Sequence, residues 1–212
     1  DGERGRSTMD VRHAPGSIVR LRAELQSPSS RESTRTALRQ ILREIHHDMA
    51  PLIPDLLALD TDDSEAKKLI YLILVNHVRT HADALETCSA ALSRDAASTN
   101  PIVRGLAVRT LTNINAPAAA GILAAALGDA DAYVRKNGAL CVSKLNAADL
   151  SVATRFVPML HQLLLDPSPA VVANAAAALV ELGEHNSGFY LALSEEEAYH
   201  LLGVLDQCTE WG

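Results

Sequence analysis

The sequence predicts an all-α protein, an α-solenoid (superhelix) built from HEAT/armadillo-like pairs of helices. The main reason is a segment that recurs with one internal spacing. Counted from its first residue, a small residue follows at +4 and aliphatic residues follow at +8 and +11, which returns to one face of a helix. Copies begin at Val103, Val134 and Val171, and a degenerate copy begins at Ala66. Spacings of 37, 31 and 37 residues between these starts are typical of stacked helix pairs.

Composition supports the same class. Aromatic residues make up only 3% of the chain and hydrophobic residues 48%, a balance that suits close-packed helices better than strands. Cys88, Cys141 and Cys208 lie far apart, which predicts reduced thiols rather than a disulfide framework. The net charge of −7 argues against a nucleic-acid partner, because nucleic acids need a continuous basic surface.

Polar breaks divide the chain into its expected elements. Residues 1–16 are polar and glycine-rich and are predicted to be a disordered leader. Residues 17–212 are predicted to form about six helical hairpins, with the array truncated at its C-terminal end. The expected helices are 18–26, 33–45, 50–59, 65–78, 81–96, 101–114, 118–127, 132–145, 150–165, 170–182 and 195–210.

Each helix start has a local reason. In the first half, the serine- and proline-rich stretch 27–30 precedes a helix with its apolar residues on one side, and the polar stretch 60–64 is the turn into the helix over 65–78. In the second half, Asn100-Pro101 and Asp166-Pro167 place a capping residue before a proline, which the first helical turn tolerates. Ser194 is expected to cap the last helix, whose first turn holds three acids, as the helix dipole favours.

The repeat also assigns structural roles. The small +4 residues are expected at helix crossings; they are Ala107, Gly138 and Ala175. Arg104 and Arg135 follow the register valines directly, just inside the second helix of each pair. In such arrays a cation at this position is expected to meet the turn acid of a neighbouring repeat.

No catalytic or metal-binding constellation is found. His77 and His81 are four residues apart, but a zinc site needs a third ligand, and no Glu follows His77 as a His-Glu-x-x-His protease requires. The sequence has no Gly-x-Ser-x-Gly motif and no phosphate-cradling glycine loop. We therefore expect a protein that is not an enzyme and has no cofactor or metal.

From Lys67 onward the chain resembles the N-terminal trunk of a β-adaptin, the large β subunit of clathrin-type adaptor complexes. The motifs that carry the resemblance occur in family order; they are Lys67–Leu72, Asn100–Thr110, Tyr133–Lys136, Pro169–Ala175 and Cys208–Gly212. The resemblance implies a non-catalytic scaffold in vesicle-mediated protein transport that packs against other adaptor subunits. It implies a cytoplasmic protein on the cytosolic face of Golgi, endosomal or plasma membranes, and contact with clathrin only through regions absent from this chain.

The same resemblance implies two contact surfaces. An Arf-type GTPase would meet the helix over 81–96 at Leu85, Glu86 and Ser89, and the polar residues there predict weak binding. Anionic lipids would meet a basic stripe in the first repeat, formed by Arg31, Arg35, Arg39 and Arg43. Four-residue spacing keeps these arginines on one helix face, and the alternative for them is a solvated face paired with nearby acids.

Other classes of protein stay open at this point. A different HEAT-type scaffold, such as a transport receptor or a phosphatase scaffold, would share the periodicity but not the ordered motifs. A base-excising glycosylase on a similar scaffold would need a basic concave face and aromatic residues, whereas residues 145–212 carry one arginine and nine acids.

Overall fold

The computed structural model describes residues 15–44, 49–184 and 191–207. Every regular element within these residues is a helix, so the predicted all-α class is confirmed. Residues 1–14 of the predicted leader lie outside the described residues. Pro15 already begins the first helix, where its missing N–H costs nothing. Among the described helices, none is both long and apolar enough to cross a membrane.

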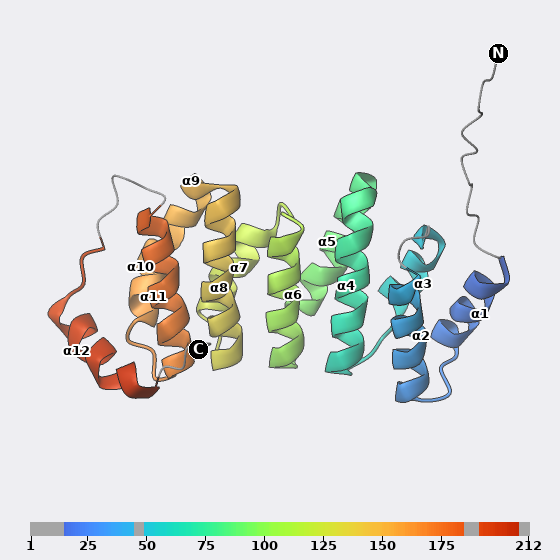
Figure 1. The fold of residues 1–212 in the computed structure, drawn as a ribbon, viewed down its shortest axis with the longest axis horizontal. Coiled ribbons are helices and arrows are strands. Elements are labelled where there is room, and N and C mark those ends of the chain that lie inside the picture. The colour runs from blue at the N-terminus through green and yellow to red at the C-terminus, as the bar shows by residue number, and fades with distance from the viewer. Residues whose placement is uncertain (1–14, 45–48, 185–190, 208–212) are drawn as a thin grey trace, which may run out of the picture. The chain divides into compact units, whose positions relative to one another are not determined.

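The chain divides into two compact units, residues 1–77 and 78–212. The first unit holds five elements, and Figure 1 labels its four α-helices. They are α1 (Pro15–Gln26), α2 (Arg31–Arg43), the 3-10 turn η1 (Ala50–Leu52), α3 (Ile53–Ala58) and α4 (Ser64–Thr80), whose last residues pass into the second unit. Ser30 starts α2 two residues earlier than predicted, because its hydroxyl accepts from the Ser33 N–H at 3.1 Å.

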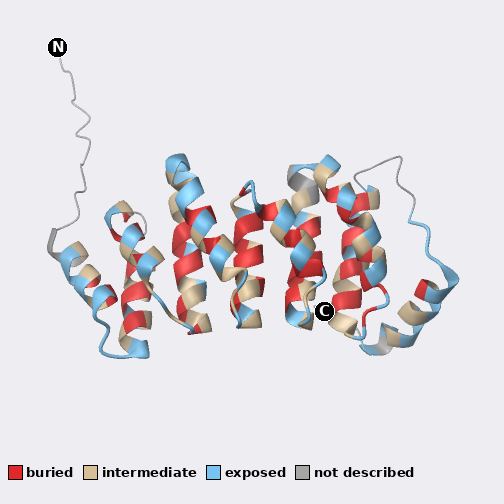
Figure 2. Ribbon diagram, turned by 180° about the vertical axis from the view of Figure 1, so that it is seen from behind, coloured by how far each residue is buried: buried red, intermediate tan, exposed pale blue. Residues whose placement is uncertain are grey.

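The second unit continues the helix pairs. Its elements are η2 (Ala82–Ala84), α5 (Leu85–Asp95), α6 (Pro101–Asn113), α7 (Ala119–Leu127), α8 (Ala132–Ala148), α9 (Leu150–Ala153), η3 (Thr154–Phe156), α10 (Val157–Leu163), α11 (Pro169–Glu184), α12 (Glu195–Val204) and η4 (Leu205–Gln207). Helices α6, α8 and α11 lie side by side and contact one another in that order, and each also packs on the helix that precedes it, α5, α7 or α10 (Figures 1 and 2).

Two of the predicted long helices are broken. The helix predicted over 81–96 is replaced at its start by the 3-10 turn η2, which precedes α5, and residues 150–165 are divided into α9, η3 and α10. The second break has a clear reason in Pro158, the second residue of α10. A proline can occupy the first turn of a helix but not its interior, because it has no N–H to donate.

The core of the second unit follows the repeat register. Leu111, Val142 and Leu179, the +8 residues, have no exposed surface, and Figure 2 shows the buried residues on the helix sides that face neighbouring helices. The +4 residues are buried as well. At Gly138 an added Cβ would lie 3.2 Å from Leu127 Cδ2 and from the Leu127 backbone nitrogen, so α7 approaches α8 closely because this residue has no side chain.

The last helix is less covered than the others. Ser194 and Glu197 form the reciprocal capping box that starts α12. Leu201 is half-buried and packs on the core, whereas Leu202 and Leu205 are 69% and 64% exposed. These two leucines are therefore left largely uncovered by the other described residues.

Replacing Ala175 by leucine tests the packing of α11. Ala175 has no exposed surface, so the added atoms would overpack a helix crossing, and we expect the free energy of unfolding to fall by about 1–3 kcal/mol. Urea denaturation measures this. Ala177→Leu, on the exposed side of the same helix, is the matched control and should change stability little; equal losses in the two variants would contradict the register.

Candidate functional site

Two bidentate arginine–aspartate pairs join successive repeats of the second unit. Arg104 donates from Nε and Nη2 to Asp129 at 2.9 and 2.8 Å, and Arg135 donates in the same way to Asp166 at 2.6 and 3.0 Å. Asp129 and Asp166 lie in the turns before α8 and α11, so each arginine reaches the turn acid of the next repeat. We call these contacts the arginine–aspartate ladder.

Each ladder arginine also holds the turn that joins the two helices of its own repeat. Arg104 Nη1 donates to the carbonyls of Ser98 and Thr99, at 2.9 and 3.2 Å. Arg135 Nη1 donates to the Asp129 carbonyl at 2.9 Å, so the two rungs are connected through the Asp129 backbone. The acids act locally too, because Asp129 Oδ1 accepts from the Asp131 N–H at 2.8 Å. The ladder therefore fixes both the turns and the spacing of the repeats.

The first unit contains a third pair of the same kind, which sequence reasoning missed. Arg35 donates from Nε and Nη2 to Asp63 at 2.6 and 2.9 Å, and Asp63 Oδ1 accepts from the Glu65 N–H at 3.1 Å. The signal was partly available, because Thr34-Arg35 resembles the Val-Arg pairs of later repeats and Asp63, like Asp129, lies in the turn before the next long helix.

In the Arg35–Asp63 and Arg104–Asp129 pairs, the pKa values of both partners are shifted. Hydrogen bonding to Arg35 holds the pKa of the Asp63 carboxyl below its ordinary value, and Arg104 does the same to the pKa of Asp129. Their aspartate partners likewise raise the pKa of Arg104 and of Arg135. Each pair is therefore an ion pair at neutral pH.

The basic stripe on α2 is largely neutralised. Arg35 belongs to the pair above and also lies 2.9 Å from Glu65, Arg39 bridges Glu32 and Glu65, and Arg31 lies 3.1 Å from Asp62. Arg43 is exposed, and within the described residues it makes no ion pair. The structure thus favours the solvated, paired alternative for three of the four arginines.

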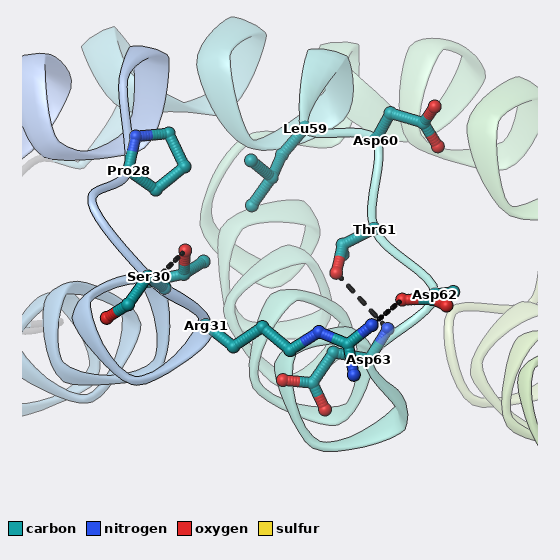
Figure 3. A pocket seen from close by; sticks show the side chains of 9 residues that line it. Pro28, Ser30, Arg31, Leu59, Asp60, Thr61, Asp62 and Asp63 are labelled. Carbon is teal, nitrogen blue, oxygen red and sulfur yellow. Dashed lines mark hydrogen bonds and ion pairs between the residues drawn. The ribbon is translucent and has the colours of Figure 1, made fainter.

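The stripe also borders an open hollow of about 490 Å³ in the first unit (Figure 3). Its lining includes Pro28 and Leu59 together with the charged side chains of Arg31, Asp60 and Asp62. Figure 3 shows the Arg31 guanidinium reaching across to Asp62. Both of these side chains are more than 70% exposed, so their pairing contributes little.

The expected GTPase surface needs a correction. Ser89 is only 8% exposed, because it lies on the side of α5 that carries the buried Cys88 and Leu92; placing it on the surface was wrong. Glu86 is exposed and Leu85 is half-buried. Of the three positions, these two alone can meet a partner.

The last helix is attached by histidines. His161 Nδ1 lies 2.7 Å from the buried Glu197, and His200 Nε2 lies 3.2 Å from the Asp166 carbonyl. The described residues bring together no group of three His, Cys, Asp or Glu side chains that could hold a metal ion.

Replacing Arg104 by alanine tests the ladder. Asp129 would lose its partner, and the Ser98 and Thr99 carbonyls would lose a donor, so we expect a loss of about 1–3 kcal/mol at neutral pH. The pKa of Asp129 is lowered in the folded state, so this contribution is complete above the ordinary aspartate pKa of about 4 and disappears as the pH falls through the folded value.

Urea denaturation at a series of pH values between about 6 and 2 measures both effects. The parent chain should lose stability on acidification, and Arg104→Ala should lose less. Arg155→Ala, at an exposed position, is the control and should follow the parent curve. Equal acid sensitivity in the parent and Arg104→Ala would show that the ladder does not keep Asp129 ionised.

Comparison with known proteins agrees with this architecture. The family model described as "Adaptin N terminal region" matches residues 18–212. The chain is 37% identical over 207 residues to the human AP-1 complex subunit beta-1, covering 93% of this chain and 22% of that protein. It is 33% identical over 206 residues to the Dictyostelium discoideum AP-1 complex subunit beta, with 93% and 22% covered. The Saccharomyces cerevisiae AP-1 complex subunit beta-1 is 33% identical over 211 residues, with 92% and 28% covered.

The chain thus spans between about a fifth and somewhat over a quarter of the length of these relatives. The predicted resemblance to the β-adaptins is confirmed by a match that includes the repeats, the ladder and both compact units. The chain belongs to the adaptin N-terminal region family.

Proposed function

We propose that this chain is the N-terminal part of a β-type adaptor subunit, acting as a non-catalytic scaffold in vesicle-mediated protein transport. The observation that carries the proposal is the family match from residue 18 to residue 212. The ladder supports it physically. A scaffold must hold its surfaces at fixed separations, and the bidentate pairs fix the spacing of neighbouring repeats through charge-assisted hydrogen bonds.

The partners follow from the names of the relatives, which are subunits of AP-1 complexes. We propose that this chain packs against other subunits of such a complex. It would do so in the cytoplasm, on the cytosolic face of Golgi, endosomal or plasma membranes. Clathrin would be contacted only through regions outside this chain.

Co-expression tests the proposal. The chain, carrying an affinity tag, is produced together with the other large subunit, the medium subunit and the small subunit of an AP-1 complex. We expect it to retain at least one of them through affinity purification and size-exclusion chromatography. An unrelated HEAT-repeat scaffold of similar length is the control. A chain that retains no more of any subunit than this control would count against the scaffold proposal.

The GTPase contact is proposed only as a weak one. With Ser89 buried and Glu86 charged, the region around Leu85 lacks the apolar centre from which such interfaces draw most of their affinity. An Arf-type GTPase loaded with GTP and added to the same purification should be retained poorly. Tight retention that Leu85→Ser abolishes would contradict this.

A membrane contact through α2 is also proposed as weak. Arg31 and Arg43 are its most exposed cations, and each basic residue near an anionic bilayer contributes roughly 1 kcal/mol. Two such residues hold an attachment that salt screens easily.

Sedimentation with phosphoinositide-containing vesicles measures the membrane contact. We expect partial binding at low salt that Arg31→Gln together with Arg43→Gln abolishes. Arg35 is left unchanged, because its removal would leave the Asp63 carboxylate without its hydrogen-bonding partner. The control pair is Arg94→Gln with Arg155→Gln, two exposed arginines of the second unit. If the α2 variant binds as well as the parent, the stripe is only a solvated face.

A further inference from the structure

Helices α6 and α8 contain no acidic residue, although the unit to which they belong is acidic. Residues 78–212 contain eight Lys and Arg and fourteen Asp and Glu, a net charge of −6. Five of the eight cations lie on these two neighbouring helices; they are Arg104, Arg109, Arg135, Lys136 and Lys144. The positive charge of this unit is therefore concentrated on two helices that contain no acidic residue.

Three of the five cations keep their full charge. Arg104 and Arg135 are neutralised by the ladder aspartates. Lys144 donates to the neutral amide oxygen of Asn113 at 2.9 Å. Arg109 and Lys136 form no ion pair with any residue in the described part of the chain. An uncompensated group of cations on an acidic background is a binding determinant for an anionic partner.

These cations lie in two rows with apolar residues between them. On each helix the row follows spacings of three and four residues, which return to one face. We call the two rows the α6–α8 face. Its members are Ile102, Leu106, Arg109 and Asn113 on α6 and Tyr133, Lys136, Leu140 and Lys144 on α8. None of the eight is buried, and Ile102 and Tyr133 are 40% and 37% exposed.

Contacts at both ends hold the two rows side by side. At the C-terminal ends of the helices the bond from Lys144 to Asn113 joins them. At the N-terminal ends the Tyr133 ring lies over Gly105, where an added Cβ would stand only 2.7 Å from Cε1. Figure 1 shows α6 and α8 as direct neighbours. The face is therefore present before any ligand binds, which reduces the entropic cost of binding.

We propose that the α6–α8 face binds an acidic peptide segment of another protein. Carboxylates of the segment would pair with Arg109, Lys136 and Lys144. Its apolar side chains would cover the exposed parts of Ile102 and Tyr133. This inference is independent of the proposed scaffold role.

The surroundings of the face favour a narrow peptide over a membrane. The neighbouring helix α11 carries Glu181 and Glu184 at exposed positions and has no basic residue. A flat anionic bilayer would meet these acids together with the cations. Each row spans twelve residues of helix, roughly 17 Å from the first to the last, and a peptide of a few turns or a short extended segment can follow it without meeting α11.

Fluorescence anisotropy with a defined probe tests the proposal. The probe is a fluorescein-labelled peptide of three Asp-Glu-Glu-Leu repeats, and its control replaces every acid by the corresponding amide. We expect the acidic peptide alone to bind at low salt and its affinity to fall as salt is added. Arg109→Glu combined with Lys136→Glu should weaken binding by about tenfold or more, because two attractive charges become repulsive.

Matched variants separate the face from general electrostatics. Arg94→Glu with Arg155→Glu changes the net charge equally at exposed positions outside the face, and it should leave binding within about twofold of the parent. Tyr133→Ser should weaken binding with the charges intact. Circular dichroism melting of each variant shows whether it folds, and Arg109→Gln serves in place of a variant that does not.

Three results would overturn the proposal. The first is equal weakening by the two double variants, which would indicate non-specific attraction. The second is no detectable binding of the acidic peptide at low salt. The third is tight binding to phosphatidylserine vesicles that Arg109→Glu with Lys136→Glu abolishes while peptide binding is unchanged, which would make the face a membrane contact.

Discussion

The bidentate arginine–aspartate pair is the interaction on which the order of this protein depends. A repeat of two helices buries too little surface to be stable alone, so its stability comes from contact with the next repeat. Apolar contacts supply most of that energy, but they allow neighbouring repeats to shift along one another. The guanidinium group can donate two parallel hydrogen bonds only to a carboxylate that lies in its plane. The pair therefore selects one relative position of neighbouring repeats among those that apolar packing permits.

The ladder is not continuous through all repeats, and its interruptions are informative. Counted by the register, Lys67 takes the arginine position in α4 and the buried Val172 takes it in α11. After α11 the polar contacts described above come from His161 and His200 instead. A histidine offers at most two donors in place of the five of arginine. The last helix is therefore held by weaker and less directional contacts than its predecessors.

The helices and their buried residues were largely predictable, whereas the pairing of the charges was only partly so. Spacing alone identifies Leu111, Val142 and Leu179 as core residues, because burial repeats with the helical period. Spacing cannot tell whether Arg35 faces solvent or an acid 28 residues away, since that depends on how the turn at Asp63 folds back. The burial of Ser89 was missed for a related reason. The 3-10 turn η2 over residues 82–84 sets where α5 begins and therefore which of its faces is covered.

The double duty of Asp129 limits how such a chain can change over time. Its carboxylate accepts hydrogen bonds from Arg104 of the preceding repeat and from the Asp131 N–H of its own turn, while its backbone carbonyl accepts one from Arg135. Inserting or deleting one residue in this turn would break all three contacts together, and no single compensating substitution would restore them. Helix surfaces can accept replacement residue by residue. The length of a turn can change only if a whole arginine–aspartate pair is lost. Families of this architecture should therefore diverge in surface chemistry far more readily than in the length of their turns.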